Sequence, residues 1–325
     1  MNQTIRSRRV GLTAIACALV CRLLSGGLPE KIAGLVTDPR VLPFLIYLET
    51  GRDVRFSASE AVFAPHFAES PPVWIPEPPE PVLPVFAGEE VALYNTSGKR
   101  PDTQAALEAP LAWDLTADGP AVLILSTHTT ESYTKSGEHY EESSPWRTLD
   151  ENYNMRAIGA RVAEILEENG ISVIRDEEMH DYPSYNGSYV HARKSIQGYL
   201  EAHPTIRLVL DLHRDAAGAG KQQLRTLAQV AGQTAAQLML VMGTNFDTWQ
   251  ENFSLAAKLQ VQLERQVPGI TRPINLRASR FNQDLSPGAL LVEVGAAGNT
   301  HAEALLAAQE LAKAIVALAK GTGPQ

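Results

Sequence analysis

The sequence predicts an α/β domain with a central, mostly parallel or mixed sheet flanked by helices. Two observations predict it. Short apolar runs of strand length alternate with segments of helical periodicity through the last two thirds of the chain. Several of these runs also stop at polar or glycine residues, as buried strands do. The chain has 325 residues, of which 44% are hydrophobic and 20% charged, so it is long enough for one large core and an additional N-terminal segment.

The first half of this alternation begins after Gly119-Pro120 with an apolar strand at residues 121–125. A helix should follow from Met155, because apolar residues then recur at helical spacing as far as Leu166. Asn169-Gly170 is typical of a helix end, and residues 171–174 are the next strand.

The second half repeats the pattern. Thr300 and Glu303 have the spacing of a capping box and should open the last helix. The expected elements are a helix around 190–200, strands at 208–212 and 238–242, a helix at 249–267, a strand at 289–294 and a closing helix at 302–319.

The N-terminus has the order of an export signal or a signal anchor. Three arginines among the first nine residues precede the apolar run 10–24. The run is shorter than the roughly 20 residues that a spanning helix needs, and Arg22 interrupts it, so cleavage of the segment stays open. We expect residues 1–30 to form a cytoplasmic tip and an anchor in the cell membrane, with a single crossing and the rest of the chain extracytoplasmic.

A proline-rich stretch, PPVWIPEPPEPVLP, occupies residues 71–84. Its prolines fix φ and remove backbone donors, which favours an extended, semi-rigid spacer. We therefore assign residues 31–112 to a juxtamembrane region with a Pro-rich linker, and residues 113–325 to the catalytic domain.

Charge and cysteine content exclude two classes of function. The formal net charge of −9 is opposite to the basic excess of a nucleic-acid-binding protein. The only cysteines, Cys17 and Cys21, lie in the N-terminal apolar run, so a metal in the folded domain would have to be held by histidines and carboxylates. Such a ligand set suits a hydrolytic zinc site better than a closed structural one.

Three expected strands end in groups that can bind a metal or transfer a proton: His128, His213 and Glu293. Because the carboxyl ends of parallel strands share one edge of a sheet, these groups can converge there. Two imidazoles and one carboxylate form a common catalytic zinc triad. We expect Glu293 to be the general base, because its valine neighbours favour the raised pKa of a proton shuttle.

The residues themselves leave the acidic metal ligand open. Asp150 and Glu151 lie just ahead of the helix that begins at Met155, on a connection expected above the sheet. The candidates are Glu131, Glu138, Asp150 and Glu151, with His139 as a further possibility.

Ordered motifs between residues 120 and 320 resemble those of the stage II sporulation protein P family of endospore-forming bacteria. They are STHTTESY (126–133), YNMRAIGARVAEILEENGISV (153–173), YPSYNGSY (182–189), LVLDLHRDA (208–216), LMLVMGTN (238–245), WQENFSLAAKLQ (249–260) and RFNQDLSPGALLVEVG (280–295).

This family is related to the zinc-dependent N-acetylmuramoyl-L-alanine amidases, so the resemblance implies their α/β fold and Zn²⁺ as the cofactor. It also implies a peptidoglycan hydrolase with amidase and stem-peptide endopeptidase activity, which thins the septal wall during engulfment at the sporulation septum. The implied partners are peptidoglycan and the stage II sporulation proteins D and M. The alternative is a non-catalytic module that binds peptidoglycan or a partner.

The resemblance also assigns roles to particular residues. It implies His128 and His213 as metal ligands and Glu293 as the catalytic glutamate. The family's acidic ligand falls on Asp150, where the change from Glu to Asp shortens the side chain by one methylene. Arg280 and Asn282, in the loop before the Glu293 strand, are expected to bind the carboxylates and amides of a stem peptide.

Overall fold

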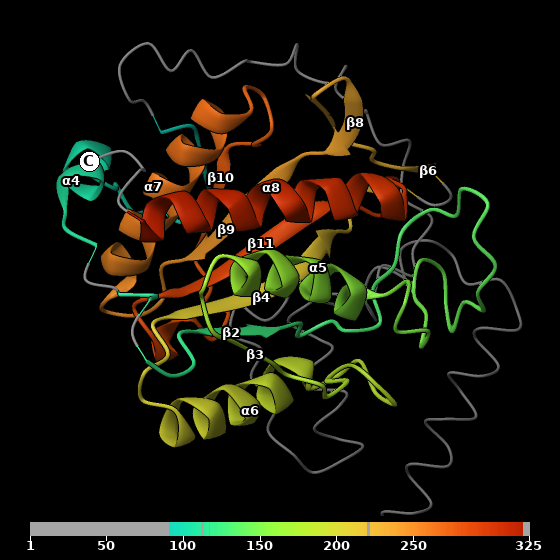
Figure 1. The fold of residues 1–325 in the computed structure, drawn as a ribbon, viewed down its shortest axis with the longest axis horizontal. Coiled ribbons are helices and arrows are strands. Elements are labelled where there is room, and N and C mark those ends of the chain that lie inside the picture. The colour runs from blue at the N-terminus through green and yellow to red at the C-terminus, as the bar shows by residue number, and fades with distance from the viewer. Residues whose placement is uncertain (1–90, 112–113, 117, 220–221, 321–325) are drawn as a thin grey trace, which may run out of the picture. The chain divides into compact units, whose positions relative to one another are not determined.

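The computed structural model describes residues 91–111, 114–116, 118–219 and 222–320, and these contain a seven-stranded sheet with helices on both faces (Figure 1). The strands of the sheet are β1 (Leu93–Asn95), β2 (Val122–Leu125), β3 (Val173–Arg175), β4 (Leu208–Asp215), β9 (Leu238–Gly243), β10 (Ile274–Arg277) and β11 (Ala289–Ala296). Two small ribbons are made by β5 (Gly218–Ala219) with β6 (Gln222–Gln223), and by β7 (Leu227–Val230) with β8 (Gln233–Ala236). The helices are α4 (Thr103–Glu108), α5 (Met155–Glu168), α6 (Ser188–Ala202), α7 (Trp249–Gln266) and α8 (His301–Ala319), with a 3-10 turn, η2 (Gln283–Leu285).

The sheet is mixed. Its strand order is β1-β10-β9-β11-β4-β2-β3. β11 is parallel to β4 and antiparallel to β9, whereas the other neighbouring pairs are parallel. Consequently β2, β3, β4 and β11 end at the same edge, and the expected central α/β sheet is confirmed.

Alternation along the strands sends side chains into two layers. On β2, Val122 and Ile124 join the core that contains residues of α5, α7 and α8, whereas Leu123 and Leu125 join the cluster that contains residues of α6. Helices α5, α7 and α8 accordingly lie on one face of the sheet and α6 on the other (Figure 1). This burial of β2 on both faces explains its continuous apolar sequence.

The ends of the long helices follow the expected capping chemistry. The Asn154 side chain accepts a hydrogen bond from the Arg156 amide at the start of α5. At the start of α8, the Thr300 side chain accepts from the Glu303 amide and the Glu303 side chain accepts from the Thr300 amide, which confirms the capping box.

Several elements were not foreseen. β1 pairs with β10, and α4 packs against α7, so residues within the segment 31–112 contribute to the folded domain. Neither element is long enough to show a hydrophobic period in the sequence, because β1 has three residues and α4 has six. The expected anchor in residues 1–30 and the proline-rich stretch 71–84 lie outside the described residues. In the described part of the chain, no helix is both long and apolar enough to span a bilayer.

The capping box can be tested by substitution. Thr300→Ala should lower the free energy of unfolding by about 1 kcal/mol, which corresponds to about 2–4 °C in melting temperature for a domain of this size. Thr248→Ala is the matched control, because Thr248 precedes α7 without a side-chain capping bond. Equal melting temperatures for the two variants in thermal unfolding would show that the box does not stabilise α8.

Candidate active site

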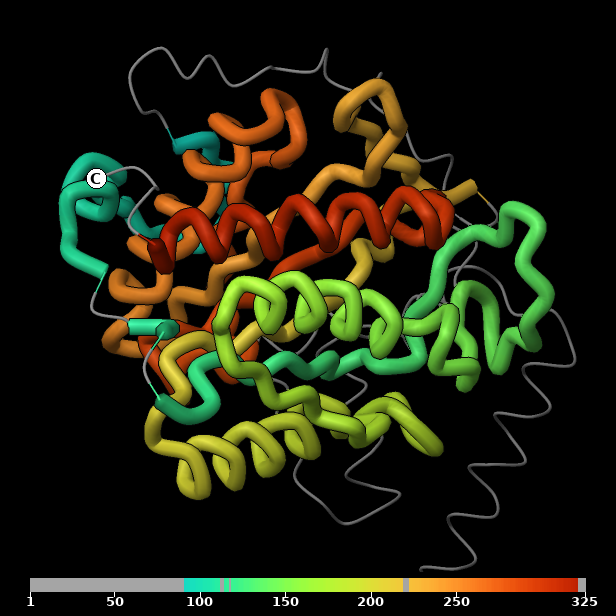
Figure 2. Tube along the Cα trace, in the orientation of Figure 1, coloured from blue at the N-terminus to red at the C-terminus, as the bar shows by residue number. Residues whose placement is uncertain are grey.

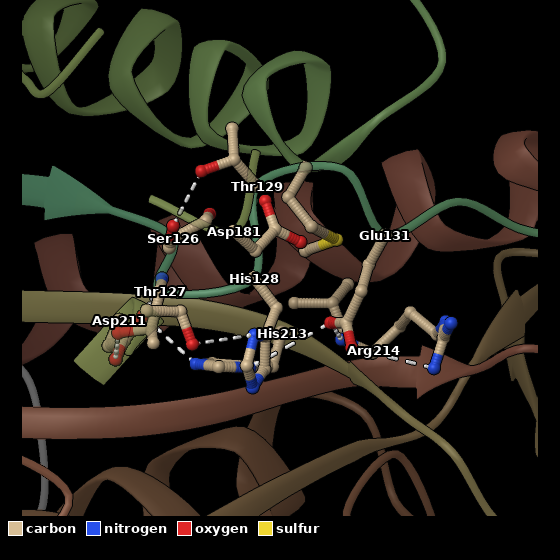
Figure 3. A network of polar contacts seen from close by, with 12 residues as sticks. Ser126, Thr127, His128, Thr129, Glu131, Asp181, Asp211, His213 and Arg214 are labelled. Atoms are coloured by element: carbon tan, nitrogen blue, oxygen red, sulfur yellow. Dashed lines mark hydrogen bonds and ion pairs between the residues drawn. The ribbon is translucent and has the colours of Figure 1, made fainter. Parts of the chain in front are cut away.

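The three chemical groups expected at strand ends lie together at the carboxyl edge of β2, β4 and β11. His213 of β4 and Glu293 of β11 are direct partners in the parallel register. His128 lies just past the end of β2, and its ring centroid is 5.2 Å from that of His213, with the two rings nearly perpendicular. Figure 3 shows the two imidazoles facing each other, with Glu131 and Arg214 beside them.

His128 is a buried, neutral imidazole. Burial is the largest influence on it and lowers its pKa from 6.5 to about 4, outweighing the opposite effect of the Glu131 charge. Its Nδ1 lies 3.4 Å from Ser188 Oγ and its Nε2 3.2 Å from Tyr185 Oη. A neutral imidazole is the form that binds a metal ion.

His213 lies between two carboxylates. Its Nε2 is 2.9 Å from Asp211 Oδ1, but the N–H is not directed at that oxygen well enough for a hydrogen bond. Its Nδ1 is 3.8 Å from Glu131 Oε2. Burial opposes protonation of His213, yet Asp211 and then Glu131 outweigh it and raise its pKa to about 9.

Asp211 is itself held in place. Its Oδ1 accepts the Thr127 amide hydrogen and its Oδ2 accepts the Thr127 hydroxyl hydrogen, each at 2.7 Å. The residue before His128 thus fixes the carboxylate beside His213, which couples the two histidine segments (Figure 3).

Glu131 is the acidic residue that the fold brings to the histidines. Its Oε2 accepts the Arg214 amide at 3.2 Å, and its Oε1 lies 3.3 Å from Arg147 Nη2 and 3.5 Å from Arg214 Nη1. Burial favours the neutral acid, but Arg214 and then the two histidines prevail and lower the pKa of Glu131. It is therefore an anion inside the site.

Asp150, which the resemblance assigned as the ligand, is placed differently. Its Oδ1 accepts hydrogen bonds from the Asn152 amide at 3.0 Å and the Asn152 Nδ2 at 2.9 Å, so the carboxylate closes a turn ahead of α5. Of the contacts made within the described ranges, none joins it to His128 or His213. The turn lies on the long excursion of the chain between β2 and α5 (Figure 2).

The other open candidates are also occupied elsewhere. The Glu151 carboxylate is 56% exposed and pairs with Arg156. Glu138 accepts the Ser136 amide within its own loop. Glu131 was among the four acids left open, and its spacing of three residues from His128 was the sequence signal in its favour.

Glu293 has the environment expected of a proton shuttle. Burial raises its pKa from 4.5 to about 8, and the negative charges of Asp215 and Glu131 add to this effect, with His213 and Arg214 opposing. Its Oε2 is fully enclosed and accepts no hydrogen bond from the described residues. A carboxyl group with this pKa can hold and release a proton near neutral pH.

The side chains fit the chemistry of a zinc site. Two buried imidazoles and an anionic carboxylate are the ligand types of catalytic zinc. Glu293 Oε2 is buried in the described structure without a hydrogen-bond partner, although buried polar atoms normally have one. Asp211 and Glu131 favour the protonated form of His213, which would release its proton on binding a metal ion. As the side chains stand, no three His, Cys, Asp or Glu in the described residues form a closed metal-binding group. Around His213, the Glu131 carboxylate lies 3.8 Å from Nδ1 and the His128 ring centroid 5.2 Å from the His213 ring centroid.

The two residues expected to bind substrate differ in availability. Asn282 is buried, has a left-handed backbone (φ 56°), and donates from Nδ2 to the Tyr189 carbonyl at 2.9 Å. It therefore positions Tyr189, whose ring stacks 6.4 Å from that of His213. The Arg280 side chain is 55% exposed and lies 4.0 Å from Asp284, so it can reach a ligand.

Sequence reasoning missed the side chains that surround His128 and Glu131. Tyr185 stacks on the His128 ring, and Tyr189 meets its edge. Arg147 contacts Glu131 and the Asp181 carboxylate. The tyrosine-rich motif at 182–189 was the available signal, but nothing in its spacing shows where the loop folds.

This arrangement defines an α/β protein with a histidine and carboxylate centre at the strand ends, where open α/β sheets bind their ligands. The chain belongs to the Stage II sporulation protein P family, whose sequence profile matches residues 87–316. Stage II sporulation protein P of Bacillus subtilis (strain 168) is 27% identical over 208 residues, which cover 61% of this chain and 50% of that relative. The match thus spans about half the length of the relative.

Solved structures of amidases share low similarity with this chain. N-acetylmuramoyl-L-alanine amidase AmiC2 of Nostoc punctiforme is 16% identical with a TM-score of 0.35, over 63% of this chain and 98% of that one. The CwlD amidase from Clostridioides difficile, in complex with the GerS lipoprotein, is 14% identical with a TM-score of 0.38, over 62% and 97%. With TM-scores below 0.5, these similarities do not bear on the function of this chain.

The raised pKa of Glu293 predicts a pH-dependent gain of stability on substitution. Below about pH 4.5 this group is protonated in both the folded and the unfolded state. Between about 4.5 and 8 the unfolded state loses the proton while the folded state keeps it, so the wild-type protein loses stability as the pH rises. Glu293→Gln removes this loss, so in metal-free protein its melting temperature should exceed that of the wild type at pH 9 and approach it at pH 4. A lower melting temperature for the variant at pH 9 would contradict the assignment.

Proposed function

We propose that this chain is a peptidoglycan hydrolase that acts as an N-acetylmuramoyl-L-alanine amidase and stem-peptide endopeptidase. The observation that carries the proposal is the convergence of His128, Glu131 and His213 beside a half-buried, protonatable Glu293. Membership in the Stage II sporulation protein P family supports a role in degrading septal cell wall during sporulation engulfment. Within this proposal, the stage II sporulation proteins D and M are partners, and an N-terminal membrane segment keeps the catalytic domain extracytoplasmic.

Zinc is the proposed cofactor, held by His128, His213 and Glu131, with Glu131 in place of Asp150. The ion would supply a Lewis acid that polarises the carbonyl group of the substrate and acidifies water. The chain fixes the ligands from behind: Asp211 lies beside His213, and the two arginines hold the Glu131 carboxylate.

Glu293 is the proposed proton carrier. As its carboxylate, it accepts a proton from the attacking water, whose oxygen forms a bond to the carbonyl carbon. It then delivers that proton to the amide nitrogen as the C–N bond breaks, because an amine leaves poorly without a proton. The products are a carboxylic acid and an amine, between which one proton passes to give a carboxylate and an ammonium group. A group with a pKa of about 8 can complete both transfers near neutral pH.

The acidic ligand is tested by metal titration. Glu131→Gln should weaken zinc binding by more than about 100-fold, since changes around metal ligands already cost 10- to 100-fold. Asp150→Asn is the matched control and should bind zinc like the wild type, because its carboxylate serves a local turn. Isothermal titration of both variants decides between them, and the opposite order would restore Asp150 as the ligand.

The activity is tested on purified peptidoglycan. Mass spectrometry should detect free stem peptides and separated cross-links after incubation with the full-length chain. Both products should disappear with a chelator and return with zinc. Glu293→Gln should keep zinc and lose turnover by about 100- to 10,000-fold, whereas His213→Ala should lose both.

Two results would contradict this assignment. No release by folded, zinc-loaded protein would favour the non-catalytic module that binds peptidoglycan or a partner. Unchanged turnover in Glu293→Gln would remove that residue from the mechanism.

A further inference from the structure

The loop between β3 and α6, residues 176–187, lies against His128. His180 Nε2 lies 2.8 Å from Asp176 Oδ2, and the Asp181 carboxylate accepts the Thr130 hydroxyl hydrogen at 2.7 Å, which fixes the start of the loop. Gly187, with φ 91°, ends it and leads into α6. The loop is therefore anchored on both sides, and Tyr185 lies between the anchors.

Tyr185 is clamped between two side chains of the site. Its ring stacks on His128 with a centroid distance of 4.6 Å and an interplanar angle of 12°. The Arg147 guanidinium lies over the Tyr185 ring, 4.8 Å from its centroid. The residue is still 42% exposed, so solvent reaches part of the side chain that holds its hydroxyl beside the site.

The Tyr185 hydroxyl is a hydrogen-bond donor in this setting. A tyrosine hydroxyl carries its proton at neutral pH, because the ordinary pKa of a phenol is about 10. His128 Nδ1 lies 3.4 Å from Ser188 Oγ. In the tautomer whose Nδ1–H donates to that oxygen, the lone pair is on Nε2 and Tyr185 Oη donates to it at 3.2 Å.

The two arginines near this point are already engaged. Arg147 is bound to Asp181 and Glu131. Arg214 is bound to Glu131 and to the carbonyl oxygens of Ser132 and Trp146. The Tyr185 hydroxyl contacts Nε2 of His128, a residue that would hold the zinc ion, so the hydroxyl lies at the edge of the proposed metal site.

Hydrolysis of an amide places negative charge on the carbonyl oxygen, and a fixed donor aimed at that charge speeds the reaction. We propose that Tyr185 is a further catalytic residue, whose hydroxyl donates a hydrogen bond to the oxygen of the scissile amide. This inference rests on the proposed amide hydrolysis. In the metal-free protein the same hydroxyl rests on His128 Nε2.

The test compares Tyr185→Phe with Tyr182→Phe in the full-length, zinc-loaded protein. Phenylalanine keeps the stacking between His128 and Arg147 and removes only the hydroxyl. Tyr182 lies in the same loop and is 53% exposed, which makes it the matched control. Tyr185→Phe should lower kcat on peptidoglycan on the order of 100-fold with little change in KM, and Tyr182→Phe should behave like the wild type.

A second measurement distinguishes a catalytic role of Tyr185 from a role in which its side chain only covers the metal-free site. Affinity for a phosphinate pseudopeptide, which carries negative oxygens at the scissile position, should fall in Tyr185→Phe by a factor similar to that in kcat. Zinc affinity should change by less than about 10-fold, because in the metal-free protein the hydroxyl gives up one neutral hydrogen bond, to His128 Nε2.

The outcomes are distinguishable. Unchanged kcat and phosphinate affinity, or tighter zinc binding with undiminished kcat, would show that Tyr185 only covers the metal-free site. Active wild-type protein with an equally active Tyr185→Phe overturns this inference alone. A wild-type protein that releases nothing from peptidoglycan overturns the proposed function, and this inference with it.

Discussion

The site depends on the register between β4 and β11. In that register His213 lies directly opposite Glu293, and both side chains point to the same face of the sheet. Because side chains alternate, a slip of one residue would send Glu293 to the helical core and leave His213 beside a valine. The register is supported from the other side by β9, which pairs antiparallel with β11 and sets Met239 opposite Glu293. In β11, Glu293 therefore has the His213 imidazole on one side and the apolar Met239 side chain on the other.

Two carboxylates in the same site are driven to different protonation states by their surroundings. Glu131 receives two guanidinium groups and an amide hydrogen, and it stays ionised although it is buried. Glu293 has an oxygen that receives no hydrogen bond from the described residues, and it tends to stay protonated. Pairs of acids separated in this way are how a protein obtains both an anion and a proton carrier near neutral pH. Removal of Arg147 and Arg214 would therefore raise the pKa of Glu131, and the loss of Arg214 would also act on the pKa of Glu293.

The sequence predicted the features that depend on local pattern and on strand ends. The apolar runs located the central strands, and the residues that follow them identified His128, His213 and Glu293 correctly as neighbours. It left the acidic ligand open among Glu131, Glu138, Asp150 and Glu151, and the resemblance favoured Asp150. Glu131 is brought back towards the histidines by a turn in which its amide donates to the His128 carbonyl at 3.1 Å. The sequence of such a turn has no hydrophobic periodicity, so it cannot be located as a strand or helix is. Tyr185 is separated from His128 by 57 residues, and only the folded loop reveals the contact.

The edge position of β1 has a mechanical consequence. β1 is the first described strand, it forms three residue pairs with β10, and β10 and β9 separate it from β11. Tension that arrives through the residues before Val91 would load this short edge pairing first. A three-residue strand peels away one hydrogen-bonded pair at a time, whereas the eight-residue strands β4 and β11 are secured by neighbours on both sides. Separation of β1 from β10 would leave the pairing of β4 with β11, and so the register of His213 with Glu293, in place.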